Sequence, residues 1–147
     1  KHGAKMIQAV ANATVPQITL HIGASFGAGH YGMCGRAFDP RFVFSWPNNR
    51  IAVMGGEQAA RVMTIVAEER GRRLGKPVNL LELERSEEQL IKQFQEESTA
   101  LFATAKLWDD GIIDPRDSRK VLGLCLAICN SAEKIQTHSN TFGVARL

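Results

Sequence analysis

Residues 23–35 read Gly-Ala-Ser-Phe-Gly-Ala-Gly-His-Tyr-Gly-Met-Cys-Gly and directly follow an apolar segment at residues 18–22. The apolar segment predicts a buried strand. Glycines allow positive φ and close approach of the backbone to a ligand. A helix that begins inside such a loop presents unpaired N–H groups and the positive end of its dipole. The stretch therefore predicts a loop that holds negative charge through its backbone.

Two familiar nucleotide-binding patterns do not explain this loop. Gly27, Gly29 and Gly32 match the spacing of the dinucleotide-binding fingerprint. That fingerprint also needs an acidic residue roughly 20 positions further on, after the next strand, and residues 42–50 contain none. No Gly-Lys-Ser/Thr follows, which excludes a P-loop. An oxyanion hole made of two successive amides at a helix start and a tight turn that packs a helix on a strand both stay open.

Composition describes an ordinary globular chain. It has 147 residues, 44% of them hydrophobic and 22% charged, with a formal charge of +3, which suits one domain with its own core. The cations alternate with acidic residues instead of forming a basic stripe, so nucleic acid is not an expected partner. No apolar run approaches the roughly 20 residues that span a bilayer, and no signal peptide is recognisable. The start without an initiator Met predicts a piece of a longer polypeptide.

The cysteines predict buried thiols. Cys34, Cys125 and Cys129 are odd in number and lack CxxC spacing, which argues against a disulfide framework and for a reducing compartment. Cys125 and Cys129 share one helix face, but no His or carboxylate stands near them in sequence. We therefore expect apolar packing there and no metal site.

Periodicity and turn residues predict an alternation of helices and strands. Asp114 and Pro115 are expected as the N-cap and first residue of the last helix. Its buried face is expected to contain Val121, Leu122, Leu124 and Ile128. The other helices are expected over 4–13, 31–35, 57–74 and 86–106, and the strands over 18–22, 41–46 and 51–54.

Three motifs in this order resemble the carboxyltransferase (beta) subunit of biotin-dependent acyl-CoA carboxylases. They are residues 23–38, residues 46–60 (Trp-Pro-Asn-Asn-Arg-Ile-Ala-Val-Met-Gly-Gly-Glu-Gln-Ala-Ala) and residues 107–119 (Leu-Trp-Asp-Asp-Gly-Ile-Ile-Asp-Pro-Arg-Asp-Ser-Arg). The 3-methylcrotonoyl-CoA and geranyl-CoA carboxylases are the most similar branch. The resemblance begins at Lys1, runs to at least Arg119 and returns at residues 142–144.

The resemblance implies an α/β fold of the crotonase-like (ClpP/crotonase) ββα spiral type. Residues 1–147 would form the C-terminal carboxyltransferase domain, the half that holds biotin, whereas the absent N-terminal half holds the acyl-CoA. The active site would lie between halves of different subunits in a homo-oligomer. Carboxybiotin would arrive on a biotin carboxylase or biotin carboxyl carrier subunit, and its carboxylate would move to the γ-carbon of an enoyl-CoA.

The same resemblance assigns residues to the site. The backbone N–H groups of Ala28 and Gly29 would form the oxyanion hole, and Phe26 and Gly27 would join them in binding biotin. In this family the biotin enolate itself is thought to take the substrate proton, so no side chain has to act as the base. Relatives often carry Asn in place of His30, and His30 is therefore not assigned a catalytic role.

Two departures from the family pattern bear on the substrate. Residues 98–102 lack the usual Gly-x-Pro-Tyr-Tyr-like sequence, and the tail over 129–140 is long and polar. Both departures favour geranyl-CoA as the substrate. The expected compartment is the cytoplasm of a bacterium or the mitochondrial matrix of a eukaryote.

Two other functions stay open: a biotin-binding and oligomerisation domain without turnover of its own, and a crotonase-type enoyl-CoA hydratase or isomerase. The latter needs a Glu or Asp at the acyl chain.

Overall fold

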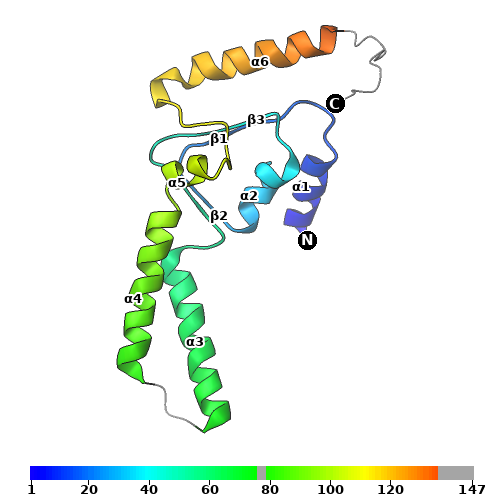
Figure 1. Ribbon diagram of the computed structural model, residues 1–147. Helices are drawn as coiled ribbons and strands as arrows, with labels where there is room; N and C mark the ends of the chain where they lie inside the picture. Colours follow the sequence, from blue (N-terminus) through cyan, green and yellow to red (C-terminus); the bar gives the residue numbers. More distant parts are fainter. Residues whose placement is uncertain (76–78, 136–147) are drawn as a thin grey trace, which may run out of the picture.

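Two pairs of short strands stand among helices in the first part of the chain, and helices follow them (Figure 1), so the predicted α/β class is confirmed. The computed structural model describes residues 1–75 and 79–135. Its elements are α1 (His2–Ala11), β1 (Ile18–His21), β2 (Ala24–Phe26), α2 (Ala28–Gly32), the 3-10 turn η1 (Arg36–Phe38), β3 (Phe42–Ser45), β4 (Arg50–Ala52), α3 (Gly56–Leu74), α4 (Leu80–Glu97), α5 (Ala100–Ala105), the 3-10 turn η2 (Pro115–Asp117) and α6 (Ser118–Lys134).

The strands form two parallel pairs. β1 lies beside β3 with His21 opposite Ser45, and β2 lies beside β4 with Phe26 opposite Ala52. β2 was not predicted, because its three residues are too few for a pattern of alternation. Pairing with β4 is what makes this segment of the glycine-rich stretch a strand. The predicted third strand over 51–54 is shorter and begins at Arg50.

The glycine-rich stretch becomes helical earlier than the predicted 31–35. α2 begins at Ala28, because Gly27 at its N-cap has φ +67° and turns the chain out of β2. Gly32 packs α2 against α1, and a Cβ on this glycine would lie 2.8 Å from the Met6 side chain. The five-residue helix is therefore held between β2 and α1.

The predicted helix over 86–106 is wrong, since two helices occupy this region. α4 starts at Leu80, where the N-cap Asn79 accepts a hydrogen bond from the Leu81 N–H at 3.2 Å. It ends before Ser98, whose carbonyl accepts from the Ile51 N–H at 2.8 Å. Thr99 then caps α5. Pairing of residues 98–99 with β4 overrides helical periodicity at this point.

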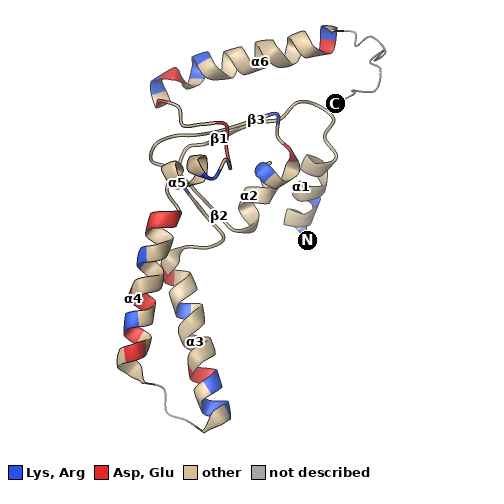
Figure 2. Cartoon of the chain, in the orientation of Figure 1, with Lys and Arg blue, Asp and Glu red and all other residues tan. Residues whose placement is uncertain are grey.

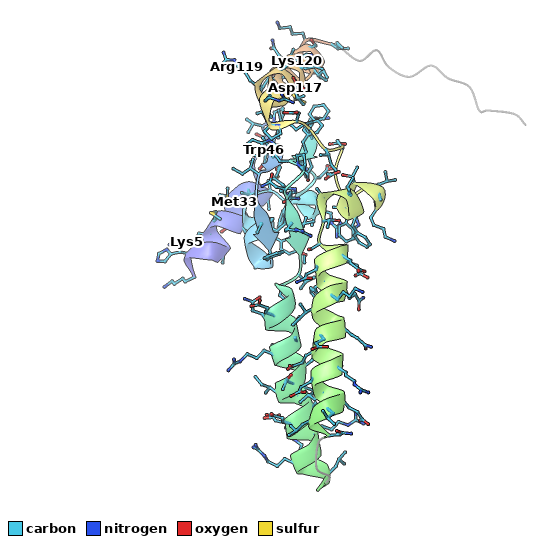
Figure 3. All side chains as sticks on the ribbon, turned by 90° about the vertical axis from the view of Figure 1, so that its left-hand side faces the viewer. Lys5, Met33, Trp46, Asp117, Arg119 and Lys120 are labelled. Atoms are coloured by element: carbon cyan, nitrogen blue, oxygen red, sulfur yellow. The ribbon has the colours of Figure 1, made fainter. Side chains whose placement is uncertain are left out.

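The predicted cap at Asp114 and Pro115 forms on the 3-10 turn η2, which leads into α6 at Ser118, and the buried face predicted for the last helix is wrong in part. The Asp114 carboxylate accepts from the Arg116 N–H at 2.9 Å, with Pro115 as the first helical residue. Leu124 and Ile128 are exposed, however, because α6 buries Cys125 and Cys129 instead. Figure 3 shows Trp46 beneath the first turn of α6, and its Nε1–H donates to the Ser118 hydroxyl at 2.9 Å.

Helices α3 and α4 form a hairpin that projects from the strands (Figures 1 and 3), and the Thr64 hydroxyl donates to the Glu87 carboxylate between them. Charged residues concentrate on this hairpin and on the two ends of α6 (Figure 2). Large apolar side chains are nevertheless exposed on both elements, among them Val62, Ile65, Val66, Leu124, Leu126 and Ile128. Apolar surface of this extent is typical of proteins that pack against a partner.

Candidate functional site: the glycine helix and its histidines

The start of α2 is fixed by Gly27. Its N–H donates to the carbonyl of Ala52 at 3.2 Å, which connects the glycine stretch to β4. Its φ of +67° is one that side chains with a Cβ rarely adopt. An added Cβ would also lie 3.3 Å from the Val53 carbonyl oxygen. Gly27 therefore aims the two amides that follow it.

The amides of Ala28 and Gly29 are available to a ligand. They are the first two helical residues, and the first N–H groups of a helix have no intrahelical partner. Within the described part of the chain, no hydrogen bond engages either N–H. Both residues are exposed, and a Cβ on Gly29 would meet nothing within 4 Å. The structure thus places two adjacent donors beside open space, as an oxyanion hole requires.

Phe26 lies at the end of β2, next to this helix start, and is 40% exposed. It lines a groove of about 410 Å³ that also contains Arg50, Met54 and Phe94. The four residues predicted for the site, Phe26, Gly27, Ala28 and Gly29, therefore stand together at the turn from β2 into α2.

Sequence reasoning missed the polar cluster behind this turn. His21 lies at the end of β1 and is only 8% exposed. Its ring centroid is 5.1 Å from that of His30 on α2. The buried Ser45 hydroxyl lies 3.4 Å from His21 Nδ1 and donates to Asp109 Oδ2 at 2.7 Å. The parallel register of β1 and β3 could have revealed the His21–Ser45 contact, but nothing local indicates Asp109.

Both histidines have a pKa below the ordinary value for imidazole. Burial is the main cause for His21, and the nearby His30 lowers its pKa further while Asp109 opposes this. For His30 burial again comes first, followed by the positive charge of Arg36. Desolvation disfavours the charged imidazolium in each case. The two rings are therefore neutral at physiological pH.

The glycine stretch has no hydrogen-bonded carboxylate: among the described residues, no hydrogen bond joins an Asp or Glu side chain to residues 23–35. Asp109 is occupied by Ser45 and by the Thr104 hydroxyl, which donates to Oδ1 at 2.7 Å. The stretch therefore offers backbone donors without an acid or base of the carboxylate type.

The three cysteines are buried and unbridged, as predicted. Burial raises the pKa of Cys34 and Cys125, so both thiols are kept protonated. In the described ranges no cluster of three metal-ligating side chains occurs. Nor does any helix there have the length and apolar character that crossing a bilayer requires.

Residues 1–144 match the carboxyl transferase domain family. The chain belongs to this family. It is 48% identical over 149 residues to the probable mitochondrial methylcrotonoyl-CoA carboxylase beta chain of Drosophila melanogaster, covering 100% of this chain and 25% of that one. It is 49% identical over 142 residues to the biotin-dependent 3-methylcrotonyl-coenzyme A carboxylase beta1 subunit of Mycobacterium tuberculosis, covering 97% and 27%.

Solved structures agree with the family assignment. The beta subunit of P. aeruginosa geranyl-CoA carboxylase superposes with a TM-score of 0.87 at 54% identity, covering 100% of this chain and 27% of that one. The transcarboxylase 12S subunit, described as a hexamer assembly, gives 0.70 at 32% identity and covers 97% and 26%. These neighbours confirm the crotonase-like fold. The chain spans about a quarter of the length of these relatives.

Proposed function

We propose that this chain is the C-terminal, biotin-side half of a carboxyltransferase subunit. The complete subunit would move a carboxylate from carboxybiotin to the γ-carbon of a branched enoyl-CoA, geranyl-CoA or 3-methylcrotonoyl-CoA. Support comes from the family match over residues 1–144 and from relatives named for these two carboxylases. The identity of 54% to the geranyl-CoA carboxylase subunit, against 48% and 49% for the methylcrotonoyl relatives, favours geranyl-CoA.

The observation that carries the proposal is the pair of free donors on Ala28 and Gly29. Biotin, brought by a partner subunit, would supply the activated carboxylate and a ureido oxygen that becomes negatively charged. The two N–H groups would hold that oxygen, and the small side chains of both residues would let the ring reach the backbone. One well-placed donor of this kind contributes about 3–4 kcal/mol to stabilisation of the transition state.

Other residues of the turn would orient these donors. Gly27 fixes their direction through its positive φ and its hydrogen bond to Ala52. Phe26 would close one side of the biotin site with its ring. His30 is not assigned as a base, because its ring is turned towards Ser25 and His21.

A crotonase-type hydratase or isomerase is less well supported. Such an enzyme would use the same amides but needs a carboxylate at the acyl chain to move a proton. The carboxylate of the buried cluster, Asp109, is already hydrogen-bonded to Ser45 and Thr104. A biotin-binding and oligomerisation domain without turnover of its own remains the second candidate, because the exposed apolar faces of α3 and α6 suit subunit contacts.

The partners and compartment follow the relatives. We expect a homo-oligomer of complete subunits, a biotin carboxylase or carrier subunit as donor, and an acyl-CoA as acceptor. Relatives occur both in bacteria and in mitochondria, so we propose the bacterial cytoplasm or the mitochondrial matrix.

The test uses the full-length subunit assembled with its biotin-carrying partner. Carboxylation of geranyl-CoA and of 3-methylcrotonoyl-CoA is followed by incorporation of labelled bicarbonate, with avidin as the control that removes biotin. We expect avidin-sensitive carboxylation of at least one of the two. Hydration or isomerisation of either acyl-CoA that persists in avidin, without incorporation of label, would instead establish the hydratase or isomerase.

A further inference from the structure

His30 is clamped between a hydroxyl and a glycine. Its Nδ1 lies 3.0 Å from the Ser25 Oγ, which belongs to β2. On the other side, a Cβ placed on Gly35 would overlap the His30 ring, and all three of its nearest heavy atoms belong to that ring. A Cβ at position 35 would therefore force the His30 ring to shift from its present place beside Ser25. His30 therefore connects the two ends of the glycine stretch.

The contacts of Ser45 fix the tautomer of His21. A hydroxyl has one proton to donate, and that of Ser45 goes to Asp109 at 2.7 Å. The Ser45 Oγ in turn accepts a hydrogen bond from Asn49 Nδ2 at 3.2 Å. For the 3.4 Å contact between Ser45 Oγ and His21 Nδ1 to be a hydrogen bond, Nδ1 therefore has to be the donor. In that tautomer His21 Nε2 is an acceptor, and it is buried without a partner in the described part of the chain.

No hydrogen-bond acceptor among the described residues meets the second nitrogen of either ring, and Asp109 only partly offsets a positive charge on His21. His21 faces His30 and, through Ser45, the Asp109 carboxylate, both of whose oxygens already accept hydroxyl protons. His30 faces the cation of Arg36, the ring of Tyr31 and His21. Neither Nε2 has a hydrogen-bond partner among the described residues. A buried charge without a partner is strongly unfavourable. A ring that takes up a proton here would therefore leave its buried position.

We propose that His21 and His30 are a positioning pair, which holds the glycine stretch in its active conformation only while both rings are neutral. The pair acts through Ser25, one residue before Phe26, and through Gly35 behind α2. Protonation in acid would push the two rings apart, release Ser25 and misdirect the amides of Ala28 and Gly29. This inference rests on the proposed function of those amides, and its tests are chosen so that the two can fail separately.

The first test is a double-mutant cycle in the full-length subunit. Transfer from the carboxylated acyl-CoA to free biotin is measured at pH 8, so that the biotin-carrying partner is not involved. Gly35→Ala should lower kcat more than tenfold in the parent, and less than twofold when His30→Ala is already present. Equal losses in both backgrounds would overturn the clamp. If Gly35→Ala does not fold, folding of the double variant supports the clamp and its failure to fold contradicts it.

The second test is the pH profile of the same reaction. On the acid side of its pH profile the parent should lose activity about tenfold per pH unit. This acid limb should be absent from the profile of the His21→Asn, His30→Asn double variant. His2→Asn changes an exposed histidine at the start of α1 and should keep the limb in place. A limb that persists in the double variant would overturn the proposal.

The third test needs no activity. Exchange of the imidazole C2 hydrogen, followed by mass spectrometry across pH, gives a titration midpoint for each histidine of the full-length subunit. We expect the midpoints of His21 and His30 below the ordinary imidazole value of about 6.5, and midpoints at or above that value would contradict the pair. An inactive parent with lowered midpoints would refute the proposed function alone, whereas an active parent with ordinary midpoints would refute the pair alone. If the His21→Asn, His30→Asn variant does not fold, the midpoints measured in the parent decide between the outcomes.

Discussion

Gly27 and Val53 approach so closely that a Cβ on the glycine would lie 3.3 Å from the Val53 carbonyl oxygen. This contact joins the first residue before α2 to the chain leaving β4. Because Gly27 also donates to the neighbouring Ala52 carbonyl, the position of the glycine helix depends on the pairing of β2 with β4.

Gly27→Ala should therefore damage both stability and activity. A left-handed conformation costs a residue with Cβ about 1–2 kcal/mol, and the Val53 contact adds to this. Urea unfolding of the full-length subunit should show a loss of at least about 1 kcal/mol. Gly23→Ala is the matched control, since a Cβ there meets nothing within 4 Å and its φ is not positive. Equal stability of the two variants would contradict the strain assigned to Gly27.

Thr99→Ala tests the break between α4 and α5. The Thr99 hydroxyl accepts from the Phe102 N–H at 3.2 Å, and loss of such an N-cap costs about 1 kcal/mol. Thr99→Ser retains the oxygen and should keep most of that stability. The two variants are compared by thermal unfolding at one scan rate. A serine variant as unstable as the alanine variant would show that the hydroxyl does not cap α5.

The pKa of His21 predicts a pH dependence of stability. Because the folded state holds this pKa below the ordinary 6.5, the unfolded chain binds more protons as the pH falls through 6.5. The contribution of His21 to stability is therefore fully present above that pH. Below it this contribution decreases until the folded pKa is reached, with a slope of at most about 1.4 kcal/mol per pH unit for one proton. His21→Asn should flatten this slope in urea unfolding between pH 7 and pH 5. A slope that is unaltered by the substitution would contradict the assignment.

Exposed apolar side chains on α3 predict self-association of the 147-residue chain. Val62, Ile65 and Val66 are each at least 50% exposed, and burying the remaining half of such a side chain against a partner gains roughly 0.8–1.5 kcal/mol. Sedimentation across a concentration series should show association that Ile65→Lys weakens. Glu68→Lys changes charge on the same helix without removing apolar surface and serves as the control. A monomer at all concentrations would contradict the expectation.

Local patterns in the sequence were enough for the elements with strong local signals. β1, β3 and α3 follow from apolar runs and helical periodicity, and the chemistry of Asp114 and Pro115 marks the start of the 3-10 turn before α6. β2 escaped because three residues carry no period. The helix over 86–106 failed because residues 98–99 form contacts with β4 that helical spacing cannot show.

The site was predictable only in part for the same reason. The glycines predict the turn at Gly27 and the free amides after it, because this turn depends only on neighbouring residues. The cluster behind the turn joins His21, Ser45 and Asp109 through the β1–β3 register and a chain segment more than sixty residues away. A contact of this kind depends on tertiary structure, and no spacing in the sequence encodes it. The exposed Leu124 and Ile128 are a further case, since periodicity shows which face is apolar but not which face is covered.

The central claim is that backbone donors at Ala28 and Gly29 stabilise the anion, and carboxyl transfer by Gly29→Pro holoenzyme tests it most directly. Leu101→Pro is the matched control, because Leu101 is exposed and holds the same second helical position in α5. With folding verified by circular dichroism, Gly29→Pro should slow transfer about 100- to 1000-fold, while Leu101→Pro stays near the parent and His30→Asn within about tenfold of it, a smaller loss than that of one lost donor. An active Gly29→Pro enzyme beside an inactive His30→Asn enzyme would contradict the account and assign the chemistry to the imidazole.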